Sequence, residues 1–84
     1  MTIEERVRAF ILECFYVSDP DELTDDVSLI DTGYVDSTGM MDVILFIEVE
    51  YAIAIDDHET IPQNLDSIAN IAAFVARKRV SAAV

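Results

Sequence analysis

The chain has 84 residues, enough for one domain with a modest hydrophobic core, because small domains bury a limited share of their surface. It contains 17 acidic and 5 basic residues, giving a net charge of −12, and 52% of it is hydrophobic. The basic residues lie near the two ends, and the stretch 9–76 has no Lys or Arg. Binding nucleic acid or an anionic membrane needs cationic side chains, so both classes of partner are excluded, whereas proteins with basic patches are favoured.

We expect residues 1–84 to form a single domain that is cytoplasmic and monomeric. Cys14 is the sole cysteine, so no intramolecular disulfide can form, which fits a reducing compartment. The first residues are too polar for a signal peptide, and no apolar run reaches the length of a membrane span.

The first helix is predicted from a capping box, Thr2 with Glu5, followed by one apolar face. That face consists of Val7, Phe10, Ile11 and Cys14. The pattern predicts a buried thiol at Cys14 and a helix end near Tyr16, before the turn signal Asp19-Pro20. The connection that follows, from about 17 to 35, is longer than most loops, which indicates a functional or anchored segment. Its expected anchors are Leu23, Val27, Leu29 and Ile30.

A second helix is predicted from Ser37 to Tyr51, with one face formed by Met40, Val43, Ile44, Ile47 and Tyr51. Met41, Leu45 and Phe46 fall away from that face, which is typical of a helix that is deeply buried or offers a surface to a partner.

Pro62 predicts a short helix, and Asp66 or Ser67 should cap the last one. The last helix has an apolar face formed by Ile68, Ile71, Ala72 and Val75. We expect Arg77, Lys78 and Arg79 to complement its negative end, and residues 80–84 to fray. The predicted fold is therefore an all-α, up-and-down four-helix bundle, with three main helices, one short helix and a long first loop.

Asp36-Ser37 places a hydroxyl at the start of an amphipathic helix, directly after the long loop. A phosphodiester on Ser37 would lie at the helix amino terminus, where free N–H groups and the helix dipole favour an anion. Asp36 can cap the helix. An isolated Asp-Ser pair is more often a cap and nothing else, so the surrounding sequence decides its meaning.

From Glu4 to about Lys78 the chain resembles the acyl carrier protein family. The motif Leu29-Ile30-Asp31-Thr32-Gly33-Tyr34-Val35-Asp36-Ser37 is similar to the family's attachment motif, and Ile61-Pro62-Gln63-Asn64-Leu65-Asp66-Ser67-Ile68 is similar to the run into its last helix. The resemblance implies a covalent 4'-phosphopantetheine arm, derived from coenzyme A, on Ser37. A thioester on that arm would hold an acyl or aminoacyl group.

The resemblance also implies that the domain is not an enzyme and has no catalytic residues. Its expected partners are a phosphopantetheinyl transferase, a loading ligase and downstream transferases with basic patches. The second helix would contact them, with Asp36, Met41, Asp42, Leu45 and Glu48 as candidate contacts. Two residues depart from the family pattern. Thr38 replaces the usual leucine, and Gly39 stands in the first turn, where glycine costs on the order of 1 kcal/mol in a helix interior. Asp36-Ser37-Thr38-Gly39 looks more like D-alanyl and other aminoacyl carriers.

The main alternative is an acidic helical adaptor that binds a basic protein without a prosthetic group. Asp19 and Asp21 have the opening spacing of a calcium loop, but Thr24 and Ile30 occupy the positions that need glycine and glutamate. His58 is the sole histidine and is expected to be solvated, so we expect no metal site.

Overall fold

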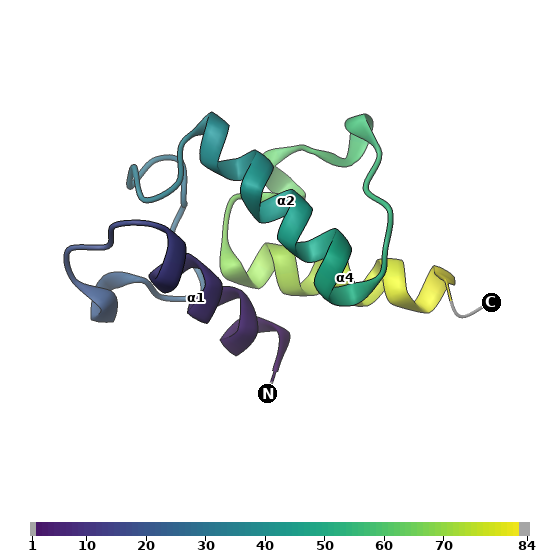
Figure 1. Cartoon of the computed structure of the whole chain (residues 1–84), viewed down its shortest axis with the longest axis horizontal. Coiled ribbons are helices and arrows are strands. Elements are labelled where there is room, and N and C mark those ends of the chain that lie inside the picture. The colour runs from purple at the N-terminus through teal and green to yellow at the C-terminus, as the bar shows by residue number, and fades with distance from the viewer. Residues whose placement is uncertain (1, 83–84) are drawn as a thin grey trace.

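The helices of this protein form a small bundle in the computed structural model, which describes residues 2–82. The four α-helices of this range are α1 (Ile3–Cys14), α2 (Ser37–Tyr51), α3 (Pro62–Leu65) and α4 (Ile68–Ala82). Two 3-10 helices, η1 (Pro20–Glu22) and η2 (Asp57–Glu59), lie in the connections, and residues 2–82 contain no strand. The predicted all-α class, with three main helices and one short one, is confirmed. Figure 1 shows α1 running opposite to α2.

The helices begin where the sequence supplies partners for their free N–H groups. The Thr2 hydroxyl accepts the N–H of Glu5, and the Glu5 carboxylate accepts the N–H of Thr2, which confirms the capping box. Ser67 is the cap of α4, because its Oγ accepts the N–H of Asn70 at 3.1 Å. Pro62 occupies the first turn of α3, as predicted.

α4 lies at the centre of the core and packs against each of the other three helices. Its face of Ile68, Ile71, Ala72 and Val75 is buried as predicted. Val7 and Ile11 from α1 and Val43, Ile44 and Ile47 from α2 pack in the same core. Each such side chain contributes about 1.5–3 kcal/mol when it is fully buried. The hydrophobic faces read from the sequence therefore account for most of the packing.

Two predicted core residues are exposed. α1 ends at Cys14, within two residues of the predicted end near Tyr16, but the thiol is exposed, because it lines a shallow groove that α1 and α2 leave open. Of the four expected loop anchors, Leu23 and Leu29 are buried and Val27 is half-buried, but Ile30 is 45% exposed. The predicted burial of Cys14 and of Ile30 was wrong, because the spacing of residues along the chain does not show which other segment of the fold packs against each of them.

The carboxyl end of α4 also differs from the prediction. Residues 80–82 were expected to fray, but the helix continues through them. The sequence after Pro62 contains no Gly or Pro that would end the helix earlier. Positions 83–84 lie outside the described residues. Only Arg79 lies in the last turn. Arg77 instead donates to Asn64 in α3, and Lys78 donates to Glu59 in the segment that leads into α3.

The long connection between α1 and α2 is fixed to the α3–α4 junction by Asp66. The Asp66 carboxylate accepts the Ser28 hydroxyl at 2.6 Å and the Ile30 N–H at 3.1 Å. Its backbone carbonyl accepts the N–H of Leu29 at 2.7 Å. Since each of these loop groups needs a partner when it leaves water, one residue holds a whole turn of the loop in place.

Replacing Asp66 tests this anchor. We expect Asp66→Ala to lower the free energy of unfolding by about 1–3 kcal/mol, because it leaves a hydroxyl and an N–H without their acceptor. Urea unfolding followed by circular dichroism measures the change. Asp26→Ala is the matched control, an exposed aspartate of the same connection with no side-chain hydrogen bond among the described residues, and its effect should stay within about 0.5 kcal/mol. Equal losses in both variants would contradict the anchor.

Candidate functional site

Ser37 is the first residue of α2, and its side chain is exposed. Asp36 is the cap, as predicted: its Oδ1 accepts the N–H of Gly39 at 2.6 Å, and its carbonyl accepts the N–H of Met40. The Ser37 hydroxyl therefore stands at the positive end of a helix of 15 residues. An anionic group attached there would lie next to N–H groups that the helix itself leaves free.

The backbone that leads to Ser37 is held from within the loop. Val35 is fully buried, and its N–H donates to the carbonyl of Leu29 at 3.1 Å. Gly33 makes the turn before it with φ 78°, a left-handed conformation that glycine adopts without strain. Partial burial raises the pKa of the Tyr34 hydroxyl, and the neighbouring Glu22 carboxylate raises it further. Tyr34 is therefore a neutral hydrogen-bond donor at physiological pH.

A groove of about 270 Å³ opens beside Ser37, between α2 and α3. Its lining consists of Ile30, Ser37, Met40, Met41, Ile44, Thr60, Ile61, Pro62, Leu65 and Asp66. Most of these side chains are apolar. Ile30, Met41 and Ile61 are 45%, 57% and 42% exposed, so apolar surface in contact with water gathers in this groove. Sequence reasoning did not find the groove, because its two sides come from segments far apart in the chain.

Gly39 has a packing role that the sequence did not reveal. A Cβ at this position would lie 2.6 Å from Cε1 of Phe15 and 3.2 Å from Oδ1 of Asp36. The Phe15 ring, which follows α1 directly, therefore rests against the first turn of α2. This contact joins the end of α1 to the start of α2, where the Asp36 cap and Ser37 lie.

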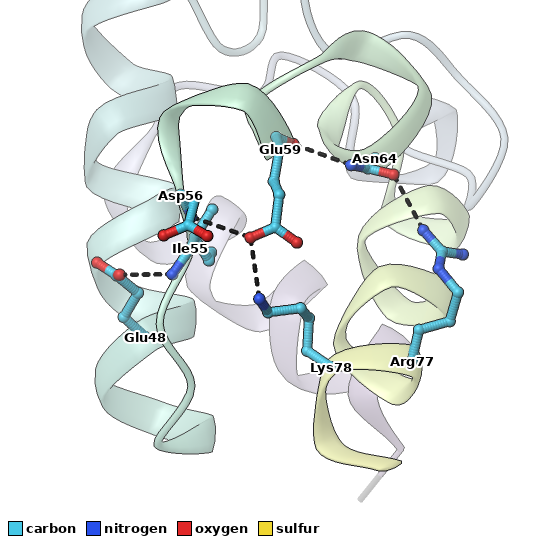
Figure 2. Close-up of polar contacts among 7 residues, drawn as sticks. All are labelled: Glu48, Ile55, Asp56, Glu59, Asn64, Arg77 and Lys78. Carbon is cyan, nitrogen blue, oxygen red and sulfur yellow. Dashed lines mark hydrogen bonds and ion pairs between the residues drawn. The ribbon is translucent and has the colours of Figure 1, made fainter. Parts of the chain in front are cut away.

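The residues predicted to face a partner separate into two groups. Met41, Asp42 and Leu45 are exposed on the outer side of α2, and Val49, which was not predicted, extends this surface at 83% exposure. Val49 is apolar and follows Leu45 by four positions, so helical spacing could have predicted that it lies on the same surface. Glu48 is half-buried, and its carboxylate accepts the N–H of Ile55 at 2.9 Å (Figure 2). Glu48 thus supports the segment after α2 and does not lie on the outer surface.

His58 is exposed, as expected, on η2. Its ring lies near the carboxylates of Asp56 and Glu59, with potential ligand atoms within 4.8 Å of one another. Glu59 already accepts the Lys78 ammonium and the Asp56 N–H. We therefore assign no metal to this cluster. Among the described residues, no helix has the length and apolar character needed to cross a membrane.

Comparison with known proteins adds no relative to this picture. No protein-family model matches the chain, and no curated protein matches it. The sequence motif and the geometry around Ser37 are therefore the basis for a function of this chain.

The contact between Phe15 and Gly39 predicts that alanine at position 39 lowers the stability of the fold, although helix propensity alone predicts that it raises it. Alanine in place of glycine should stabilise a helix by up to about 1 kcal/mol, but here the methyl group meets the Phe15 ring. We expect Gly39→Ala to destabilise the fold by about 1–3 kcal/mol, the usual cost of overpacking. Urea unfolding measures it.

The control removes the ring. In a Phe15→Ala background, the same Gly39→Ala change should be neutral or stabilising, because the obstructing atoms are gone. A double-mutant cycle with no coupling between the two positions would contradict the assigned contact.

Proposed function

We propose that this domain is a carrier protein, with a 4'-phosphopantetheine arm on Ser37 that holds an acyl or aminoacyl group as a thioester. The observation that carries the proposal is the exposed Ser37 hydroxyl at the amino terminus of α2, on the lining of an apolar groove. The attachment motif resembles that of acyl carrier proteins, and the geometry fits its chemistry.

The phosphodiester of the arm suits the position of Ser37. The Asp36 cap uses one N–H group of the first turn, that of Gly39, and so leaves others near Ser37 available to an anion. The helix dipole stabilises a negative charge there, typically by about 0.3–1 kcal/mol at an exposed site. The same charge placed in the middle of the acidic surface would have no such support.

The groove offers the attached group a place out of water. Its side chains Met40, Ile44 and Leu65 are half-buried or buried, whereas Ile30 and Ile61 stand in contact with solvent. Burying apolar area contributes about 25 cal/mol per Å², so an apolar cargo gains by folding back into the groove. This contact supports an acyl group more strongly than a small polar aminoacyl group.

Attachment itself requires another protein. The groove residues around Ser37 include no His, Lys or Arg that could take the hydroxyl proton or bind the phosphates of coenzyme A. A transferase would supply both groups. The Ser37 oxygen would form the new phosphate ester, the nucleotide portion of coenzyme A would leave, and the transferase base would receive the proton.

Loading of the arm tests the proposal. Incubation with coenzyme A and a broad-specificity phosphopantetheinyl transferase should add the mass of one arm, measured by intact-protein mass spectrometry. Ser37→Ala should abolish the increment and keep the helical circular dichroism spectrum. Ser18→Ala, which removes an exposed hydroxyl elsewhere, should load like the wild type. Loading of Ser37→Ala would refute the site, and an unmodified wild-type chain beside a carrier that loads in the same reaction would favour the adaptor alternative.

The acidic surface gives a second prediction about the same reaction. The kcat/KM of loading should fall by about 3–10-fold between about 0.05 M and about 0.5 M salt, since ions screen attraction to a basic partner. Asp42→Asn, on the outer side of α2, should weaken both the rate at low salt and its salt dependence. Asp21→Asn, on η1, removes the same charge away from that surface and should leave both unchanged. A rate independent of salt would contradict electrostatic recognition.

A further inference from the structure

The segment 52–61, here named the strap, joins α2 to α3 and bounds the groove beside Ser37. Its last two residues, Thr60 and Ile61, belong to the groove lining. Ile53 is buried and Ile55 is packed partly buried against the core, so apolar packing holds the first part of the strap, whereas residues 56–60 are polar. The strap begins at Ala52, whose φ of 53° is the only positive value among the described residues other than glycine. A left-handed alanine costs roughly 1–2 kcal/mol, so other contacts must hold the strap in this position.

Those contacts are polar and reach three helices (Figure 2). On the α2 side, the Glu48 carboxylate accepts the N–H of Ile55 at 2.9 Å. On the α4 side, Lys78 Nζ donates to Glu59 Oε1 at 2.9 Å. On the α3 side, the Asn64 amide donates to the carbonyl of Glu59 at 2.9 Å. Two of the three contacts therefore converge on one residue of the strap.

Glu59 links the local turn to the bundle through one carboxylate oxygen. Oε1 accepts the Asp56 N–H at 3.0 Å, which closes η2, and also the Lys78 ammonium. The Asp56 N–H and then the Lys78 ammonium hold the pKa of Glu59 below its usual value, so the carboxylate is charged at neutral pH. Among ion pairs within residues 2–82, this one is the most covered, with side-chain exposures of 25% and 18%, against 41% and 36% for Arg6–Glu50.

We propose that the strap is a lid on the groove beside Ser37, and that the Glu59–Lys78 ion pair is the latch that keeps it closed. When the pair opens, η2 keeps its own cap through Asp56, so the turn moves as a unit. Thr60 and Ile61 follow it, and the groove widens on the side away from α2. The lid itself depends on the contacts above, whereas its use in admitting cargo rests on the proposed function.

Amide hydrogen exchange on the folded, unmodified chain tests the latch whatever is attached to Ser37. In Lys78→Met, we expect amide exchange at Ile55, whose N–H donates to Glu48 of α2, to accelerate by about 3–10-fold, with no change at the core amide of Ile71. The amides of Glu59 and Thr60 donate within η2 and should stay protected, because that turn moves as a unit. Glu59→Gln, which keeps an oxygen acceptor for the Asp56 N–H but removes the charge, should give the same local result. Arg8→Met, which removes the Arg8–Asp25 ion pair elsewhere, should leave the strap unchanged.

Groove access is measured separately, with the neutral apolar dye N-phenyl-1-naphthylamine. Its association rate should rise by about the same factor in Lys78→Met and Glu59→Gln as strap exchange does, and not in Arg8→Met. High salt should accelerate strap exchange in the wild type but not in Lys78→Met, since the pair that salt weakens is then absent.

Three outcomes would overturn the proposal. Unchanged strap exchange in both latch variants would remove the latch. Equal acceleration at Ile71 would show general loosening of the fold in place of a local opening. Faster strap exchange without faster dye association would show that the strap is not a lid. A failure to load Ser37 would affect none of these measurements, so the proposed function and the lid can fail independently.

Discussion

The place of Ser37 in the molecule depends on a carboxylate outside its motif, that of Asp66. Through Ser28, Leu29 and Ile30, Asp66 fixes the middle of the long connection to the junction of α3 and α4. Leu29 in turn accepts the N–H of Val35, two residues before Ser37. A loop of this length has few apolar anchors, so its backbone groups need partners of this kind to adopt one conformation. The start of α2 and the wall of the groove therefore share one support.

The positively charged side chains are likewise used for contacts that stabilise the fold. Each of the five basic side chains has a partner within the described residues: Arg6 with Glu50, Arg8 with Asp25, Lys78 with Glu59, Arg77 with Asn64, and Arg79 above the ring of Tyr51. All five serve the fold, and none lines the groove beside Ser37. The surface around Ser37 thus combines acidic and apolar groups, and cations for an anionic ligand must come from a partner.

The sequence predicted the parts of this structure that depend on local spacing. Residues Ser37–Tyr51 of α2, the Thr2 cap and the buried face of α4 follow from helical periodicity and capping chemistry, which involve near neighbours. The site was predicted as far as Asp36 and Ser37. The exposure of Cys14, the inward carboxylate of Glu48 and the groove could not be predicted, because each depends on which distant segment lies opposite. Gly39 shows the difference most clearly: propensity marks it as a weakness, whereas the Phe15 ring makes it necessary.

The adaptor alternative and the carrier proposal make different use of the same helix. A basic partner bound to Met41, Leu45 and Val49 would explain the outer apolar surface of α2 under either reading. It would not explain a second apolar surface, the groove, that includes Ser37 in its lining. Met41 belongs to both surfaces, since it lines the groove and is 57% exposed on the outer side. Under the carrier proposal, a partner that covers Met41 would therefore also contact one wall of the groove beside Ser37, so a single docking surface would reach both the outer side of α2 and the place where the arm is attached.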